Sequence, residues 1–252
     1  MKNKSIKTIK MTTLTKIIVA TLMSLTLFSC NFDMHFNPGV RGNGNVQTET
    51  RNINESFSSI HVSRGLDVYL TQSNDQIIEV EADENLLDII VVEVENDELK
   101  ITTTDNIAYS KAQKVMVSFK DVSKITSTSG SDVFSTNIIT ADELNLKTTS
   151  GSDMELEVDT NTLVCKSTSG SDLRLSGKTN NLFAEATSGS DIKAGKLLAQ
   201  SSQVEVTSGA DITVNTSQEL NAKASSGGDI TYYGNPEIVK KSDGVSGSIR
   251  KR

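Results

Sequence analysis

Residues 168–172 read Thr-Ser-Gly-Ser-Asp, and this motif recurs through the second half of the 252-residue chain. Each of its six copies ends at an aspartate: Asp132, Asp153, Asp172, Asp191, Asp211 and Asp229. The spacing between successive aspartates is therefore nearly constant along the chain. Self-similarity with a period of about 20 residues is typical of solenoid proteins, in which each repeat stacks on its neighbours.

The residues around each motif alternate between apolar and polar types. After Asp172, the apolar Leu173 and Leu175 flank the polar Arg174, and upstream the small Cys165 is followed by Lys166. Alternation with period two predicts a strand with one buried face. We therefore expect each aspartate to open a strand, a second strand to lead into each motif, and Cys165 to be a buried, unreactive side chain.

Strands joined by such short motifs predict an all-β fold, a right-handed parallel β-solenoid (β-helix) with about 20 residues per coil. Parallel strands cannot be joined by hairpins, so the chain must wind. The glycine of each motif supplies the positive φ that a sharp corner requires. The narrow interior of such a coil also explains why aromatic residues make up only 4% of the chain, with no Trp.

The chain divides into four expected segments. Residues 1–29 have a basic start, a short apolar run and a small residue before Cys30, which is the anatomy of a bacterial lipoprotein signal peptide. Cys30 would then be acylated (palmitate) and become the mature N-terminus, although an ordinary cleaved signal is the alternative. Residues 30–50 are rich in turn formers and predict a flexible tether.

The remaining two segments form the predicted solenoid. Residues 51–125 are a divergent β-rich N-terminal part, in which 63–68 (Ser-Arg-Gly-Leu-Asp-Val) match the repeat and predict a first coil around Asp67. Residues 126–250 are the regular repeat coils. Between Asp75 and Glu98 there are ten acidic residues and no basic one, which we interpret as a solvated strand face. The basic residues after 239 predict a solvated tail that discourages further strand pairing.

Composition excludes several classes of function. A net charge of −7 argues against a nucleic-acid partner. Two His and two Cys leave little basis for a zinc or histidine active site, so no catalytic residue, metal or cofactor is predicted.

Several stretches resemble one family. Residues 42–46 (Gly-Asn-Gly-Asn-Val), 65–72 and 233–236 (Tyr-Gly-Asn-Pro), together with the Ser-Gly-Ser-Asp coils, resemble the head GIN domain family of auto-transporter adhesin type. The resemblance covers residues 42 to 250. It implies a β-solenoid lipoprotein of Bacteroidetes-type bacteria, and it carries no catalytic residues over to this chain.

The six aspartates of the motif would form a row with one carboxylate per coil. Like charges about 5 Å apart repel by roughly 1 kcal/mol or more, so something must offset them. One explanation is that each carboxylate accepts backbone N–H bonds in its own turn. The alternative is calcium along the ladder, with Asp132, Asp153, Asp172, Asp191, Asp211 and Asp229 as the candidate ligands.

An enzyme is not predicted, because no coil departs from the repeat in a way that marks an active site. Arg174 is interpreted as part of a charge pair across coils with Glu155. The sequence therefore predicts a lipid-anchored protein of the cell envelope, placed at the outer membrane, that acts as a non-catalytic, adhesin-like binding module for a glycan or protein surface. A structural or stress-related envelope component without an external ligand is the alternative. A calcium-binding repeat protein and a polysaccharide-active enzyme rank lower.

Overall fold

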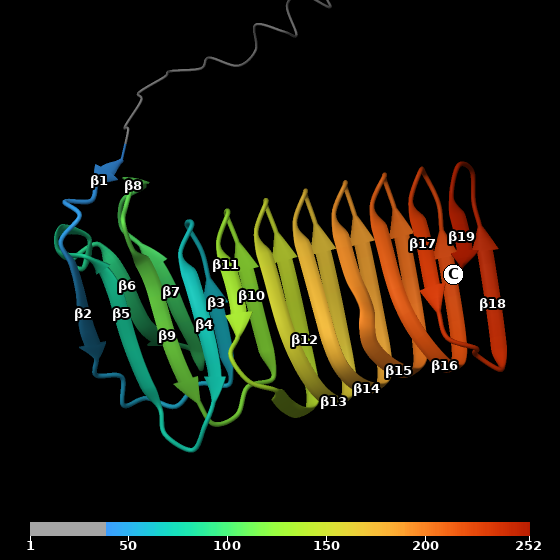
Figure 1. Ribbon diagram of the computed structural model, residues 1–252, viewed down its shortest axis with the longest axis horizontal. Helices are drawn as coiled ribbons and strands as arrows, with labels where there is room; N and C mark the ends of the chain where they lie inside the picture. Colours follow the sequence, from blue (N-terminus) through green and yellow to red (C-terminus); the bar gives the residue numbers. More distant parts are fainter. Residues whose placement is uncertain (1–38) are drawn as a thin grey trace, which may run out of the picture. The chain divides into compact units, whose positions relative to one another are not determined.

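The computed structural model describes residues 39–252, and Figure 1 shows their strands winding into stacked coils. All of the regular structure is β except one short 3-10 helix, η1 (Glu84–Leu86). Residues 39–252 contain no helix long and apolar enough to cross a membrane. The predicted all-β parallel solenoid is confirmed.

The coils of the repeat region are built from long strands, most of which begin at the motif aspartate. These strands are β11 (Asp132–Ser135), β12 (Ile139–Thr149), β13 (Asp153–Thr168), β14 (Asp172–Thr187), β15 (Asp191–Thr207), β16 (Asp211–Ala224) and β17 (Asp229–Tyr233). Neighbouring strands are parallel and almost in perfect register. Strands β13 and β14, for example, pair from Asp153↔Asp172 to Thr168↔Thr187. Each coil therefore places equivalent residues directly above one another.

The divergent first coil also lies in register with the repeat. It is formed by β3 (Ser59–Val62) and β4 (Asp67–Gln72), which pair in parallel with β10 (Lys124–Thr128) and β11. Asp67 pairs with Asp132, as the match at residues 63–68 predicts. The long segment 73–123 separates these two coils in the sequence, but the chain returns to the same register.

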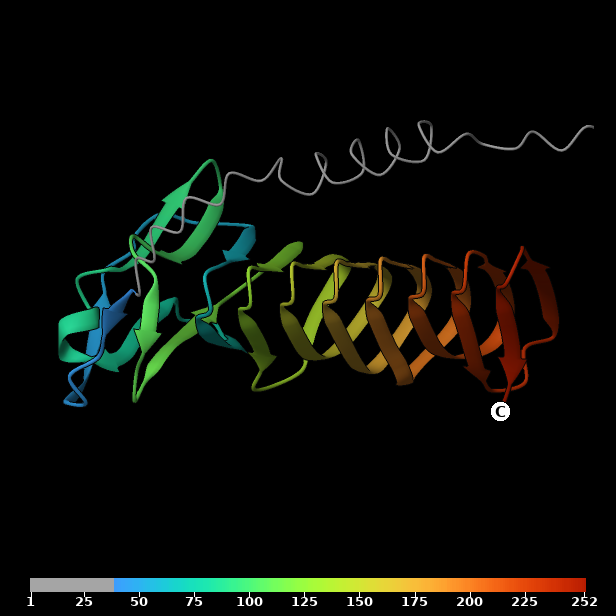
Figure 2. The ribbon, with the colours of Figure 1, turned by 90° about the horizontal axis from the view of Figure 1, so that it is seen from above.

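That intervening segment builds an antiparallel cap over the N-terminal end of the solenoid, visible at the blue and green end of Figure 2. Its elements are β5 (Ile77–Asp83), β6 (Ile90–Glu95), β7 (Glu98–Thr103), β8 (Ile107–Tyr109) and β9 (Gln113–Phe119). Strands β5 and β9 are antiparallel, as are β6 and β7, whereas β7 and β9 join the first coil in parallel.

The segment expected to be a flexible tether, residues 30–50, contains paired strands in its described part, from residue 39 onward. Within it, β1 (Val40–Arg41) pairs with β8, and β2 (Val46–Arg51) pairs antiparallel with β5. Hydropathy gave no signal for β2, because its four central side chains are exposed. Backbone pairing with β5 and a hydrogen bond from the Arg51 side chain to Leu87 O (2.7 Å) hold the strand. The buried Asp83 carboxylate fastens this region by accepting N–H bonds from Gly44 (2.8 Å) and Lys111 (3.0 Å).

The basic C-terminal segment is a coil rather than the expected tail. Strand β18 (Ile238–Asp243) pairs with β16, and β19 (Ser248–Lys251) pairs with β17. The sequence did not indicate a strand here because every β18 side chain is exposed. Ser246, which has a φ of 59°, forms the corner between the two strands.

Each corner of the repeat has two consecutive residues in the left-handed region, not only the expected glycine. At one corner, Ser169 has a φ of 60° and Gly170 a φ of 68°. Two successive positive φ values are the feature of tight type I′ turns. The glycine amide then bonds to the next coil, as Gly170 N does to Ser188 O at 3.2 Å. The backbone ladder thus continues through the corners.

Under the corners, the core holds buried hydroxyl groups that were not predicted. Ser190 Oγ donates to Ser167 O of the preceding coil at 2.8 Å. The same pair of positions is Ser127 with Ser152 and Thr148 with Ser171 in earlier coils, but Ala186 with Ala210 and Val206 with Gly228 in later ones. A Cβ on Gly228 would lie 3.0 Å from the Val206 methyl groups. The residue types at these two positions are therefore matched from coil to coil. Hydroxyl residues face hydroxyl residues, and the larger Val206 faces the glycine.

Candidate functional site

The aspartates of the motif form a ladder along one edge of the coils. Parallel register aligns Asp67, Asp132, Asp153, Asp172, Asp191, Asp211 and Asp229 in that order. Lys114 occupies the position before Asp67, and Ser248 the position after Asp229. The ladder therefore has seven members, one more than the motif copies suggest.

Two basic side chains lie between the central carboxylates and offset their repulsion. Arg174 donates to Asp172 at 2.6 Å and lies 3.5 Å from an oxygen of Asp153. Lys193 contacts Asp172 at 2.9 Å and Asp191 at 3.0 Å. Acids and bases thus alternate in the order Asp153, Arg174, Asp172, Lys193, Asp191.

This arrangement corrects two expectations about the ladder. Arg174 pairs with aspartates rather than with Glu155, although Glu155 is its neighbour in register. The aspartates do not cap their own turns either, because the corner amides are already engaged. Asp153 N, for example, donates to Ser131 O of the previous coil at 3.1 Å. Within a turn it is the serine before the aspartate that accepts, as Ser171 Oγ does from Thr168 N at 3.2 Å.

The two carboxylates that flank this central network, Asp132 and Asp211, have raised pKa values. Burial raises the pKa of Asp132, and the neighbouring carboxylates Asp153 and Asp67 raise it further. Partial burial likewise raises the pKa of Asp211, which is mostly exposed, and Asp191 and Asp229 add to the effect. The negative charge of the ladder is therefore least neutralised at Asp132 and Asp211, on the two sides of Arg174 and Lys193.

The ladder is not shaped as a closed metal centre. In the described part of the chain, no three His, Cys, Asp or Glu side chains are grouped as a metal site requires. The six candidate calcium ligands lie in a row with one carboxylate per coil, and basic side chains already supply part of the neutralisation. Calcium binding along this row stays an untested hypothesis.

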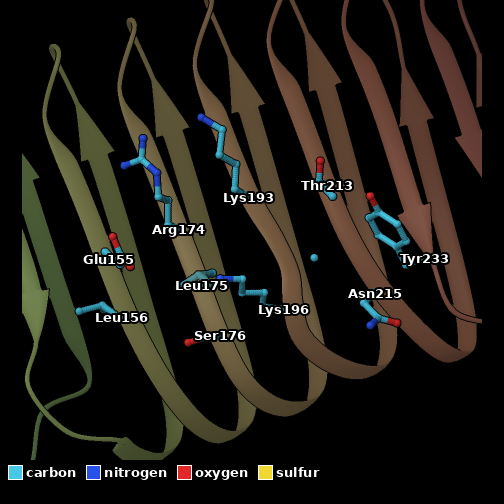
Figure 3. Close-up of a pocket in the computed structure, with 11 residues that line it drawn as sticks. Glu155, Leu156, Arg174, Leu175, Ser176, Lys193, Lys196, Thr213, Asn215 and Tyr233 are labelled. Atoms are coloured by element: carbon cyan, nitrogen blue, oxygen red, sulfur yellow. The ribbon is translucent and has the colours of Figure 1, made fainter. Parts of the chain in front are cut away.

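Arg174 and Lys193 also line an open groove of about 560 Å³, which crosses five coils, from β13 to β17 (Figure 3). Its polar lining comes from Glu155, Arg174, Ser176, Lys193, Lys196, Thr213, Asn215 and Tyr233. These side chains stand on the outer face of the strands, in positions that alternate with the buried leucines. The groove thus combines charged, amide, hydroxyl and aromatic groups on one rigid sheet face.

A β-bulge in β15 shapes the groove. Lys193 pairs with Arg174, but Lys196 pairs with Ser176, so β15 has one residue more than β14 in this stretch. Gly195 lies in the bulge, where a Cβ would be 3.5 Å from the ring of Tyr233. The Tyr233 ring therefore extends from β17 across β16 to the backbone of β15. A bulge is a common device for redirecting side chains beside a binding site.

Sequence analysis missed this special coil. The available signal was the interval from Asp191 to Asp211, which is longer than the next interval, from Asp211 to Asp229. The added residue in one coil is compensated in the next, so the average period hides it. Within the sequence, Tyr233 stands out only as part of the stretch 233–236 that resembles the family, and no pattern marks Lys196.

The three basic groups of the groove differ in what they bind. Arg174 and Lys193 are held by ladder aspartates, and hydrogen bonding to Asp172 raises the pKa of the Lys193 ammonium. Lys196 is exposed, and among residues 39–252 it forms no ion pair. The free positive charge of the groove is therefore that of Lys196, beside the bulge.

The two cysteines have different positions. Cys30, the predicted lipidation site, lies outside the described residues. Cys165 is 1% exposed, and burial raises the pKa of its thiol, as expected of a packing residue.

Solved structures from the Bacteroidetes are similar to this chain. A "putative adhesin" from Bacteroides fragilis has a TM-score of 0.78 at 21% identity, covering 84% of this chain and 100% of the other. A "putative lipid binding protein" from Parabacteroides distasonis has a TM-score of 0.71 at 23% identity, with 84% and 99% covered. A "putative adhesin" from Parabacteroides merdae has a TM-score of 0.69 at 18% identity, with 84% and 98% covered. At these identities the likeness establishes the fold alone.

Family membership rests on the sequence match. No curated protein matches this chain. The model of the family described as "Putative auto-transporter adhesin, head GIN domain" matches residues 56–236, which is most of the chain. The sequence features, the stacked coils and this match agree, and the protein belongs to the head GIN domain family.

Proposed function

We propose that this protein is a non-catalytic, adhesin-like binding module of the bacterial cell envelope, held to a membrane by a lipid on Cys30. Its ligand is an extended glycan that lies along a face of the solenoid. The observation that carries the proposal is the open groove across β13 to β17, which presents polar groups and an aromatic ring on a rigid sheet.

The geometry of the groove favours binding over catalysis. A general acid and base must both reach the reacting atoms with suitable proton affinities. Arg174 and Lys193 are engaged by ladder aspartates, and Glu155 is an exposed carboxylate on the outer strand face. Long polymers suit a repeat protein, because a site built from stacked coils presents similar groups at regular intervals.

The membrane anchor is supported by the sequence before the solenoid. A basic segment, an apolar run and a small residue directly before Cys30 match a lipoprotein signal. We propose the outer membrane as its location, which the lipoprotein signal and the membership of an adhesin family support. Protease treatment of intact cells tests surface exposure, since an adhesin must be accessible from outside.

A binding screen with the purified mature protein tests the proposal. The probes are polysaccharides and host-matrix proteins arrayed on one surface, with heat-denatured protein as the control. Retention of at least one extended glycan supports the proposal. Retention of none of the probes contradicts it and favours a structural envelope component instead.

A further inference from the structure

The bulged coil creates a local feature that the flat strand faces lack. In β16, no residues pair with Gly195, Lys196 and Leu197, because the register moves from Ala194↔Val214 directly to Leu198↔Asn215. Lys196 therefore stays in register with Ser176 of β14 but has no partner residue in β16. Gly195 beside it leaves open the space that a side chain would fill.

An aromatic ring borders that space. Tyr233 is partly exposed, and its ring lies close to Gly195 and to the Thr213 methyl group, which a Cβ at Gly195 would approach to 3.2 Å. Aromatic rings offer an apolar surface with a polar tip, which suits partners that have both C–H and hydroxyl groups. A pyranose ring is such a partner.

The polar groups around the ring fit the substituents of a sugar. Asn215, in register with Tyr233, can both donate and accept hydrogen bonds through its amide. Lys196 supplies a positive charge that no acidic side chain in residues 39–252 neutralises. A carboxylate on the ligand would give Lys196 a charge-assisted hydrogen bond, which is stronger than a neutral one.

We infer that the bulge in β15 builds a subsite for one carboxylated pyranose, a uronic acid residue within an extended glycan. The pyranose lies against Tyr233, its carboxylate binds Lys196, and its hydroxyl groups bond to Asn215 and Thr213. This inference rests on the proposed function, because it names the sugar class that the groove selects. A volume of about 560 Å³ lies within the range of small-molecule sites.

The test compares the affinities of two matched probes by titration calorimetry. Hyaluronan oligosaccharides carry the carboxylate, and the same oligosaccharides after carboxyl reduction lack it. We expect the wild-type protein to bind hyaluronan about tenfold more tightly than its reduced form, because one charge-assisted hydrogen bond is lost. Lys196→Gln should remove that difference without weakening binding of the reduced form.

Two further variants separate the subsite from a general charge effect. Lys147→Gln removes an exposed lysine from β12, outside the groove, and should leave affinity unchanged. Gly195→Leu fills the groove but alters no charge, and should abolish binding of both oligosaccharides. Circular dichroism and thermal melting of each variant confirm that the fold is retained.

The outcomes distinguish this inference from the proposed function. Equal affinity for the two oligosaccharides, or an equal loss from Lys147→Gln and Lys196→Gln, would overturn the uronic acid subsite while glycan binding stands. If hyaluronan does not bind but another arrayed glycan does, the sugar class is wrong. If no glycan binds at all, both the proposed function and the inference fail.

Discussion

Arg174 donates a hydrogen bond of 2.6 Å to Asp172, which lies two positions earlier on the same strand. The guanidinium reaches back toward the corner, so that it also approaches Asp153 of the previous coil. A ladder of like charges is thus stabilised by a base placed on the strand immediately after the corner.

Removing this base should destabilise the solenoid modestly. Arg174→Gln leaves Asp153 and Asp172 without their shared cation, and we expect a loss of about 1 kcal/mol, because half-exposed ion pairs are screened by water. The loss should shrink at high salt. Urea unfolding at two ionic strengths measures it. Lys178→Gln, which breaks an exposed pair with Asp159 outside the ladder, is the control, and equal effects of the two variants would contradict this role.

The carboxylates on the two sides of the network predict that the stability of the fold depends on pH. Asp132 and Asp211 have a pKa raised above the ordinary 3.8, chiefly by burial and then by neighbouring carboxylates. Between pH 3.8 and the raised pKa values, the folded state therefore binds more protons than the unfolded state. The stability that these two groups contribute is fully present below pH 3.8, and it is lost as the pH rises through their pKa in the folded state.

Asp211→Asn isolates this effect. The variant should be more stable than the wild type at neutral pH, by less than about 1 kcal/mol because the group is largely exposed. The gain should disappear as the pH falls toward 3.8, and unfolding by urea across this range measures it.

The pKa of Asp83 is shifted in the opposite direction. Burial raises this pKa, but hydrogen bonds from the amides of Gly44, Ala112 and Lys111 lower it overall. Asp83→Asn should therefore destabilise at neutral pH, and a stabilising Asp83→Asn would refute this account.

Two glycines with positive φ, one in a motif corner and one within β14, should respond differently to alanine. Gly170 has a φ of 68° with no atom within 4 Å of an added Cβ, so Gly170→Ala should cost only the backbone penalty of about 1–2 kcal/mol. Gly177 has a φ of 103°, and its added Cβ would lie 2.1 Å from Val158 O. Gly177→Ala should therefore cost clearly more. Thermal unfolding of both variants decides the matter, and equal losses would contradict the expected clash with Val158 O.

The paired positions under the corners should be coupled. Gly228→Ala places a methyl group against Val206 and should destabilise the protein, whereas Val206→Ala leaves a cavity. The double variant recreates the Ala186–Ala210 pair of an earlier coil. We expect its loss to be smaller than the sum of the single losses by about 1 kcal/mol. Additive losses in a double-mutant cycle would disprove the coupling.

The lipid anchor has a direct chemical test. Cys30→Ser removes the thiol that the signal sequence presents for acylation. The wild-type protein should incorporate labelled palmitate and sediment with membranes, and the variant should do neither. Palmitate incorporation by the Cys30→Ser protein would exclude this anchor.

The repeat could be predicted because the same backbone environment recurs in each coil. Alternation around Asp172 indicated which side chains are buried, and the match at Asp67 predicted the first coil across a long insertion. The edge strands β2 and β18 could not be predicted in this way. Their side chains are mostly exposed, so backbone pairing rather than hydropathy determines them.

The candidate site was harder to predict than the fold. Lys196 and Tyr233 are far apart in the sequence, and both line the groove, where a bulge in β15 changes the register between the strands. Neutralisation of the aspartates was expected from the backbone amides of their own turns, but corner amides such as Asp153 N donate to carbonyl groups of the neighbouring coil. Arg174 and Lys193 neutralise the three central members, Asp153, Asp172 and Asp191.

The central claim is that the groove face binds an extended glycan without cleaving it. The most direct measurement is capture of polysaccharides by the immobilised protein, followed by sizing of both the bound and the unbound chains. We predict that at least one polysaccharide is retained, at its original length, and that Gly195→Leu abolishes the retention. Shortened chains would reveal an enzyme, and retention unaffected by Gly195→Leu would place binding elsewhere on the molecule.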